Sequence, residues 1–68
     1  MNFFWKTKDG KTMSISTMTE SHIHNVVKCL QGKGKYTIPS PYIGLTRNVW
    51  LAVFQREIIN RGQPLIFN

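Results

Sequence analysis

His22, His24 and Cys29 are the side chains of this chain best suited to a transition metal, because zinc prefers imidazole nitrogen and thiolate sulfur as ligands. In a helix, however, His24 lies about 200° around the axis from His22, at about 100° per residue, so the three side chains do not converge. A structural zinc site also requires four ligands, and the chain has no further pair at a short loop spacing. We therefore expect no metal ion and no other cofactor. We expect His22 to pack or to form a hydrogen bond where a hairpin meets a helix.

Cys29 is also a candidate nucleophile, which would require a base within reach and a site that excludes water. The chain has only three acids and two histidines, and both histidines lie on the same short segment. A chain of 68 residues also has little room for an enclosed cleft beside its core. We therefore expect a non-catalytic protein in which Cys29 is a buried or half-buried thiol. As the single cysteine of the chain, it forms no intrachain disulfide.

The glycine-rich segment from Gln31 to Tyr36 has the composition of a phosphate-binding loop but not its pattern. It lacks the G-x-x-x-x-G-K-[ST] spacing, no strand precedes it and it does not open a helix, so we do not expect it to cradle a nucleotide. Contact with a nucleic-acid backbone fits better, because lysines carry the charge and tyrosines can stack on bases. The alternative is a solvated basic loop whose tyrosines pack on the domain. The residues that we expect to contact an anionic partner are Lys28, Lys33, Lys35, Tyr36, Tyr42, Arg47 and Arg56.

The charge balance also favours an anionic partner, since nine Lys and Arg residues stand against three acids and the formal net charge is +6. Such a partner can be RNA, DNA or an acidic protein. A basic surface that only keeps the protein in solution is the alternative. The longest wholly apolar run, Val49 to Phe54, is too short to span a bilayer, and the N-terminus lacks the pattern of a signal peptide. We therefore expect a cytoplasmic protein with no part in a membrane.

The N-terminal segment, about 3–15, predicts a β-hairpin because two short runs of aromatic and branched residues flank a turn sequence. A three-residue loop, Lys8 to Gly10, pairs Trp5 with Met13, whereas a two-residue loop would pair Trp5 with Ser14. The three-residue loop places its glycine at the left-handed position and gathers the apolar side chains on one face. We predict this register, in which that face consists of Phe3, Trp5, Met13 and Ile15.

An amphipathic helix over about 20–31 is predicted to cover the apolar face of the hairpin. Its apolar residues recur at i, i+3, i+4 and i+7, the spacing of one helix face, and they are Ile23, Val26, Val27 and Leu30. Thr19 is the expected N-cap, with Met18 and Ile23 as a hydrophobic staple, and Thr17 is the competing cap.

The segment 32–45 is predicted to be an irregular loop, in which Tyr36 to Ile38 is a candidate for a short strand. A second helix follows over about 47–61, with Thr46 as its N-cap and Gly62 just after its end.

The second helix has a broad apolar arc, which we expect to lie on the hairpin, on the first helix or on both. The residues of this arc are Val49, Trp50, Val53, Phe54 and Ile58. Glu57 falls within the arc, and a buried carboxylate is costly unless it is paired. Arg61, four residues later, is the local candidate for its partner, and a histidine of the first helix is the distant one. The apolar tail, 63–68, either packs on the domain or meets another chain through Leu65, Ile66 and Phe67.

Several of these residues resemble a pattern of small, mostly uncharacterised proteins of tailed bacteriophages. The pattern is W-x-T-x-D-G, then M-T-x-x-H-[IL]-x-N, then an E-x-x-x-R-G helix end, and its parts start here at Trp5, Met18 and Glu57. The match covers the N-terminal half and, more loosely, the second helix, whereas the segment 33–45 has no counterpart. Because the matching residues look structural, the resemblance implies a phage origin, and with it the cytosol of a host, more than an activity.

The sequence therefore predicts one small α+β domain over 1–68, in which an N-terminal β-hairpin packs on two α-helices in the order ββαα. We expect a non-catalytic, phage-type accessory protein that binds a host or viral macromolecule, and the charge favours nucleic acid or an acidic host protein that handles it. The alternative is a protein-binding inhibitor of a host enzyme or defence system, which would use the loop from Pro39 to Ile43 and the apolar tail. Association of two copies through that tail is a third interpretation.

Overall fold

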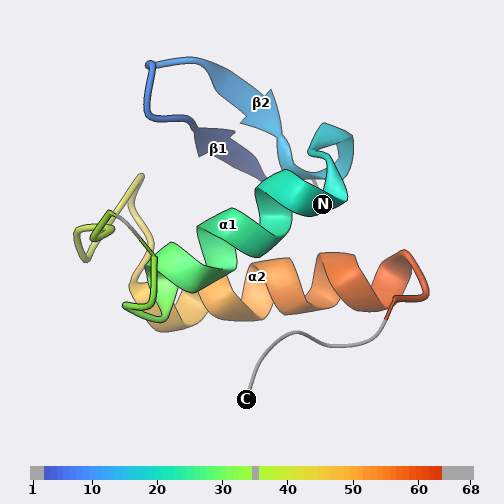
Figure 1. Cartoon of the computed structure of the whole chain (residues 1–68). Helices are drawn as coiled ribbons and strands as arrows, with labels where there is room; N and C mark the ends of the chain where they lie inside the picture. The colour runs from blue at the N-terminus through green and yellow to red at the C-terminus, as the bar shows by residue number, and fades with distance from the viewer. Residues whose placement is uncertain (1–2, 35, 64–68) are drawn as a thin grey trace.

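The computed structural model describes residues 3–34 and 36–63, which form a small α+β domain (Figure 1). The elements in chain order are strands β1 (Phe4–Lys6) and β2 (Thr12–Ser14), the 3-10 turn η1 (Ile15–Thr17), and helices α1 (Glu20–Leu30) and α2 (Arg47–Asn60). The two strands form an antiparallel hairpin that lies over the helices in Figure 1. The predicted ββαα order is therefore confirmed, and each helix begins at its predicted residue.

The hairpin has the predicted register. Trp5 pairs with Met13, and the Ile15 N–H donates to the Phe3 carbonyl at 3.0 Å, so the loop consists of the three residues from Lys8 to Gly10. The glycine of this loop has a φ of 87°, in the left-handed region that glycine adopts without strain. The second strand is shorter than predicted, because η1 begins at Ile15 and turns the chain toward the start of α1.

Both helices begin at the predicted caps. The Thr19 hydroxyl accepts a hydrogen bond from the His22 N–H at 3.2 Å, and the Thr46 hydroxyl accepts one from the Val49 N–H at 3.3 Å. Each bond satisfies an N–H group that the first turn of a helix leaves without a partner. The competing cap, Thr17, lies within η1. The two residues of the predicted staple are buried, namely Met18 and Ile23.

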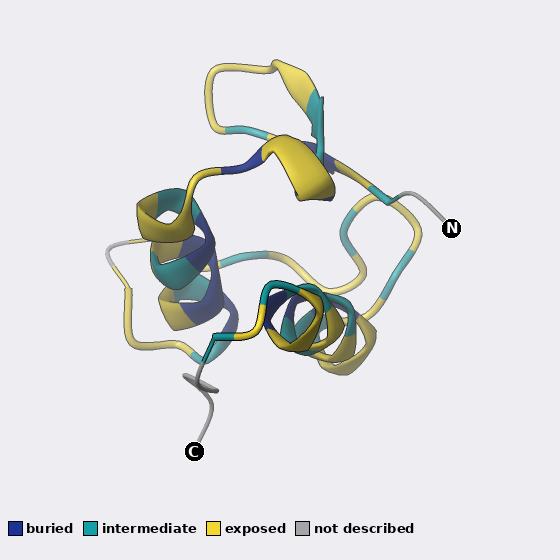
Figure 2. Ribbon diagram, turned by 90° about the vertical axis from the view of Figure 1, so that its right-hand side faces the viewer, coloured by how far each residue is buried: buried dark blue, intermediate teal, exposed yellow. Residues whose placement is uncertain are grey.

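The core lies between the hairpin and the two helices, where the buried residues face one another (Figure 2). The Trp5 ring meets the Trp50 ring edge-on, with 4.9 Å between centroids, and lies 5.4 Å from the Phe54 ring. Full burial of one such side chain stabilises a fold by about 1.5–3 kcal/mol. The predicted stripe of α1 belongs to the same core and consists of Ile23, Val26, Val27 and Leu30. α1 therefore shares one core with the hairpin, whose Phe3 and Trp5 rings meet the rings of α2.

α2 buries a narrower stripe than the sequence predicts. Trp50, Phe54 and Ile58 recur every four residues, and each is at most 1% exposed. Val49, in contrast, is 42% exposed, and Val53 is only half-buried. Val49 precedes Trp50 by about 100° around the helix and so lies at the edge of the packed face. The prediction that Val49 belongs to the buried arc is wrong.

The connection between the helices is irregular, as predicted, but Tyr36 to Ile38 forms no strand. The Ile38 carbonyl accepts hydrogen bonds from Nε and Nη2 of Arg47, at 2.9 and 2.7 Å. A side chain, and not a second strand, therefore satisfies this backbone group, and the strand prediction is wrong. Farther along, Tyr42 and Leu45 form an isolated antiparallel bridge around a tight turn. The predicted contacts of the tail beyond Gln63 lie outside the described residues.

The Arg61 side chain forms a half-buried ion pair at the end of α2 and also connects this end to η1. Arg61 Nε donates to the Glu57 carboxylate at 2.7 Å, which confirms the local partner over a histidine. Arg61 Nη2 donates to the carbonyls of Met18, at 2.8 Å, Ile15, at 3.2 Å, and Ser16, at 3.4 Å. The sequence predicts the ion pair, but it does not reveal the bond to Ile15, which lies 46 positions away.

Candidate nucleic-acid interface

A groove of about 340 Å³ opens between the hairpin, α1 and the segment 36–42. We call it the hairpin groove. Its volume falls in the range of small-molecule pockets, about 300–1,000 Å³. Side chains from all three walls line it, among them Trp5, Lys6, Lys8, His22, Asn25, Cys29, Tyr36 and Ile38.

The α1 wall of the groove carries three polar side chains on one helix face. His22, Asn25 and Cys29 have the spacing i, i+3 and i+7, so they lie above one another beside the buried stripe. Asn25 is exposed, whereas His22 and Cys29 are half-buried. This wall therefore offers imidazole, amide and thiol groups to a ligand.

Gly34 fixes the chain closely against Cys29 where it leaves α1. A Cβ atom at Gly34 would lie 2.6 Å from Cys29 Sγ and 3.0 Å from the Cys29 backbone nitrogen, so only glycine fits without a shift. This close approach holds the chain after α1 against Cys29. This glycine of the glycine-rich segment thus has a packing role that the sequence alone does not reveal.

The mouth of the groove is formed by a contact between the hairpin loop and the segment 36–42. Lys8 Nζ lies 4.0 Å from the centroid of the Tyr36 ring, a cation–π contact, and also donates to the Tyr36 hydroxyl. The two residues are 28 positions apart. Tyr36 nevertheless remains 51% exposed, so a ligand can reach its ring.

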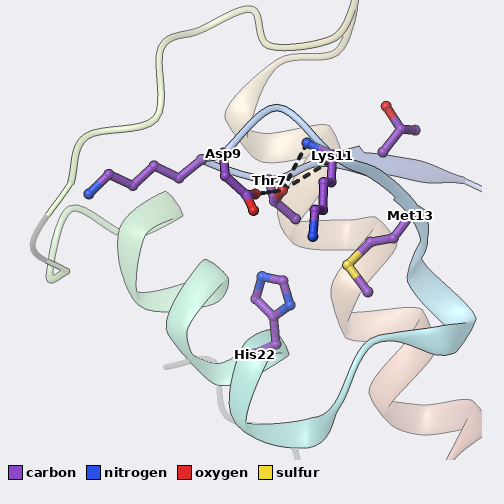
Figure 3. Close-up of a pocket in the computed structure, with 7 residues that line it drawn as sticks. Thr7, Asp9, Lys11, Met13 and His22 are labelled. Atoms are coloured by element: carbon purple, nitrogen blue, oxygen red, sulfur yellow. Dashed lines mark hydrogen bonds between the residues drawn. The ribbon is translucent and has the colours of Figure 1, made fainter.

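A second hollow lies on the other side of His22, beneath the hairpin loop (Figure 3). In Figure 3 the His22 ring points up toward the hairpin loop, where Asp9 and Lys11 lie, with Met13 to one side. His22 and Lys8 line both this hollow and the hairpin groove. The two concave surfaces therefore form one continuous region around the hairpin loop.

Asp9 is the acid of this region, and its neighbours keep it ionised. The Thr7 hydroxyl donates to the Asp9 carboxylate and, together with the positive charge of Lys11, lowers the pKa of Asp9 below its usual value. Thr7 also closes the hairpin loop, because its N–H donates to the Lys11 carbonyl at 2.7 Å. The carboxylate thus forms part of the turn.

The hairpin supplies three exposed lysines that sequence reasoning did not select: Lys6, Lys8 and Lys11. The signal that could have found them is their spacing. A tight turn between Lys8 and Lys11 returns the chain on itself and keeps the three charges on one short ribbon. These lysines carry much of the positive charge around the groove.

The structure brings Tyr36 and Tyr42 to the hairpin groove, but the other predicted contact residues that it describes lie elsewhere. Lys28 and Lys33 are exposed near the end of α1, and the Lys33 N–H donates to the Lys28 carbonyl at 2.8 Å. Lys35 lies outside the described residues. Arg56 is exposed on α2 and lines a different hollow.

Tyr42 and Arg47 make contacts within the domain. The Tyr42 ring lies 5.0 Å from the Trp5 ring, and its hydroxyl donates to the Lys6 carbonyl at 2.8 Å. The Arg47 guanidinium is held by the Ile38 carbonyl, as described above. The interpretation of packed tyrosines therefore holds for Tyr42, whereas Tyr36 is open to a partner.

The three possible metal ligands do not converge. Among residues 3–34 and 36–63, no three His, Cys, Asp or Glu side chains are close enough together to hold a metal ion. His24 Nε2 lies 3.8 Å from Glu20, whereas His22 and Cys29 line the hairpin groove. The arrangement is the one that helix geometry predicts for these positions.

Comparison of the chain with protein-family models, with curated proteins and with solved structures found no match. In the part of the chain that the structure describes, neither helix combines the length and the apolar character needed to cross a membrane.

Proposed function

We propose that this protein binds nucleic acid through the hairpin groove and the lysines around it, without catalysing a reaction. The observation that supports the proposal is the contact of Lys8 with a half-exposed Tyr36 at the mouth of the groove. A lysine attracts phosphate, and an exposed tyrosine beside it provides a surface on which a base can stack. The resemblance to small phage proteins fits an accessory protein that acts on a host or viral macromolecule in the cytosol of a host.

The acids of the chain oppose phosphate binding weakly at this site. Glu57 is paired with Arg61 at the end of α2, and neither Glu57 nor Glu20 lines the hairpin groove. Asp9 is the exception, but Lys8 lies beside it and Lys11 follows just after the loop. The region around the groove therefore has an excess of positive charge, which favours a polyanion.

A titration of labelled RNA and labelled duplex DNA, followed by fluorescence anisotropy, tests the proposal. We expect binding that weakens between about 50 and 200 mM salt, with a slope of log K against log salt of about −0.7 to −0.9 for each phosphate neutralised. Lys8→Gln should weaken binding and reduce this slope. Arg56→Gln removes the same charge from a surface away from the groove and should have the smaller effect. No binding of either nucleic acid at low salt would overturn the proposal.

A second candidate function, inhibition of a host protein, is supported by one observation in the loop from Pro39 to Ile43. Ile43 is 47% exposed and has a φ of 49°, which a β-branched residue seldom adopts. An exposed apolar side chain held in this way suits a protein contact. Capture from a nuclease-treated lysate distinguishes the two functions. A protein partner that Ile43→Ser loses and Lys8→Gln retains would favour inhibition.

A further inference from the structure

We infer that the hairpin groove receives one unpaired nucleobase of a single-stranded nucleic acid, which stacks on Tyr36 while its phosphates lie on the hairpin lysines. The inference rests on the proposed function and narrows it to a class of nucleic acid. It separates this protein from those that read a duplex through its grooves.

The shape of the basic region argues against a duplex. Proteins that read duplex DNA project a helix or ribbon into a groove about 12 Å wide. Here α1 exposes one basic side chain, Lys28, and α2 exposes Arg56, so neither helix presents a basic face. The hairpin is itself a basic ribbon, but its strands are only three residues long, and two of its lysines, Lys6 and Lys8, line a recess. A recess cannot be filled by a base that remains paired within a duplex, whereas an unstacked base can enter it.

The lining of the recess matches the two chemical parts of a base. Ile38 and Pro39 give it apolar surface, which suits the flat faces of a base. Asn25 and His22 stand on the α1 wall, and their amide and imidazole groups can pair with the polar edge of a base. A volume of about 340 Å³ suits one base better than several.

Tyr36 provides the stacking surface. Its ring lines the groove and is 51% exposed, and Lys8 holds it from across the groove mouth. Stacking of a base on an aromatic side chain needs no particular sequence, because every base has a flat face. The same lysine carries a charge that can neutralise the neighbouring phosphate. The contact therefore predicts affinity for single strands with little preference for sequence.

Three probes of equal length test the inference: a single strand, the duplex that it forms with its complement, and a strand that lacks its bases. The probes are made of RNA or of DNA, whichever binds more tightly in the titration of the proposed function. We expect the single strand to bind at least about tenfold more tightly than the duplex. Tyr36→Leu should weaken binding of the single strand about tenfold, within the range for loss of one stack. It should leave the salt slope and the binding of the base-free strand unchanged.

Two variants serve as controls. Phe4 is an aromatic residue of almost equal exposure, 53%, which does not line the groove, so Phe4→Leu should bind as the parent does. Tyr36→Phe keeps the ring and should retain most of the affinity. Equal binding of single strand and duplex, with no effect of Tyr36→Leu, would overturn the inference and leave the proposed function standing. An equal loss of affinity for all three probes in Tyr36→Leu would also overturn the inference. No binding of any probe by the parent would refute the proposed function itself.

Discussion

Replacement of Arg61 by alanine tests whether this side chain fastens α2 to the start of α1. The Arg61 side chain is 21% exposed and that of Glu57 is 19% exposed, so water screens their ion pair only in part. We assign about 0.5–1 kcal/mol to that pair. The two shorter bonds from Nη2, to the carbonyls of Met18 and Ile15, contribute about 1 kcal/mol each. The loss in the free energy of unfolding should therefore be about 2–3 kcal/mol.

A loss of this size corresponds to a fall in Tm of about 10–20 °C for a domain of this length. Urea unfolding can be followed by the fluorescence of Trp5 and Trp50, which are 3% and 1% exposed in the folded protein. Glu57→Gln is the matched control, because it removes the ion pair and leaves the carbonyl bonds in place. It should cost about 1 kcal/mol or less. If Arg61→Ala costs no more than Glu57→Gln, the bonds to the two carbonyls contribute nothing and the reasoning is refuted.

Three further predictions concern the groove and the hairpin loop. Gly34→Ala should lower the free energy of unfolding by about 1–3 kcal/mol, because its Cβ would overlap Cys29, and unchanged urea unfolding would contradict this. Thr7→Val should return the lowered pKa of Asp9 toward its usual value of about 3.9, as an NMR titration of the carboxylate would detect. Folding lowers the pKa of Asp9, so the bond from Thr7 stabilises the fold at a pH above the usual pKa. This stabilisation is lost as the pH falls through the lowered pKa of the folded protein. Stability below pH ~3.9 should therefore differ less between parent and variant than stability at neutral pH. Asp9→Asn should strengthen binding of nucleic acid about twofold to fivefold, by removing a charge that repels phosphate, and weaker binding would count against the proposed function.

The features that the sequence predicts well depend on residues close together in the chain. Thr19 and Thr46 cap helices through bonds to the third residue after them, and helix spacing alone separates His24 from His22. The hairpin register follows from the alternation of apolar residues in the two strands and from the glycine of the loop. In each of these cases a few neighbouring residues decide the geometry.

Several of the contacts that sequence reasoning misses depend on the path of the irregular segment between the helices. That path brings Tyr36 to Lys8 and Tyr42 to the Lys6 carbonyl, and it places the Ile38 carbonyl at the Arg47 guanidinium. Neither periodicity nor propensity specifies such contacts, because each joins a loop residue to a distant element. For the same reason, the sequence could name Tyr36 and Tyr42 as stacking candidates but could not tell which of them was free.

The bond from the Tyr42 hydroxyl to the Lys6 carbonyl has a consequence for aggregation. In this register, Phe4 and Lys6 direct their backbone polar groups away from the partner strand, toward the outer edge of β1. An open edge of this kind is a template on which another chain can add a strand and start a fibril. Tyr42 occupies the Lys6 position of that edge, and the lysine side chain there adds a charge that repels a second copy. The short ribbon is thereby protected from edge-to-edge growth.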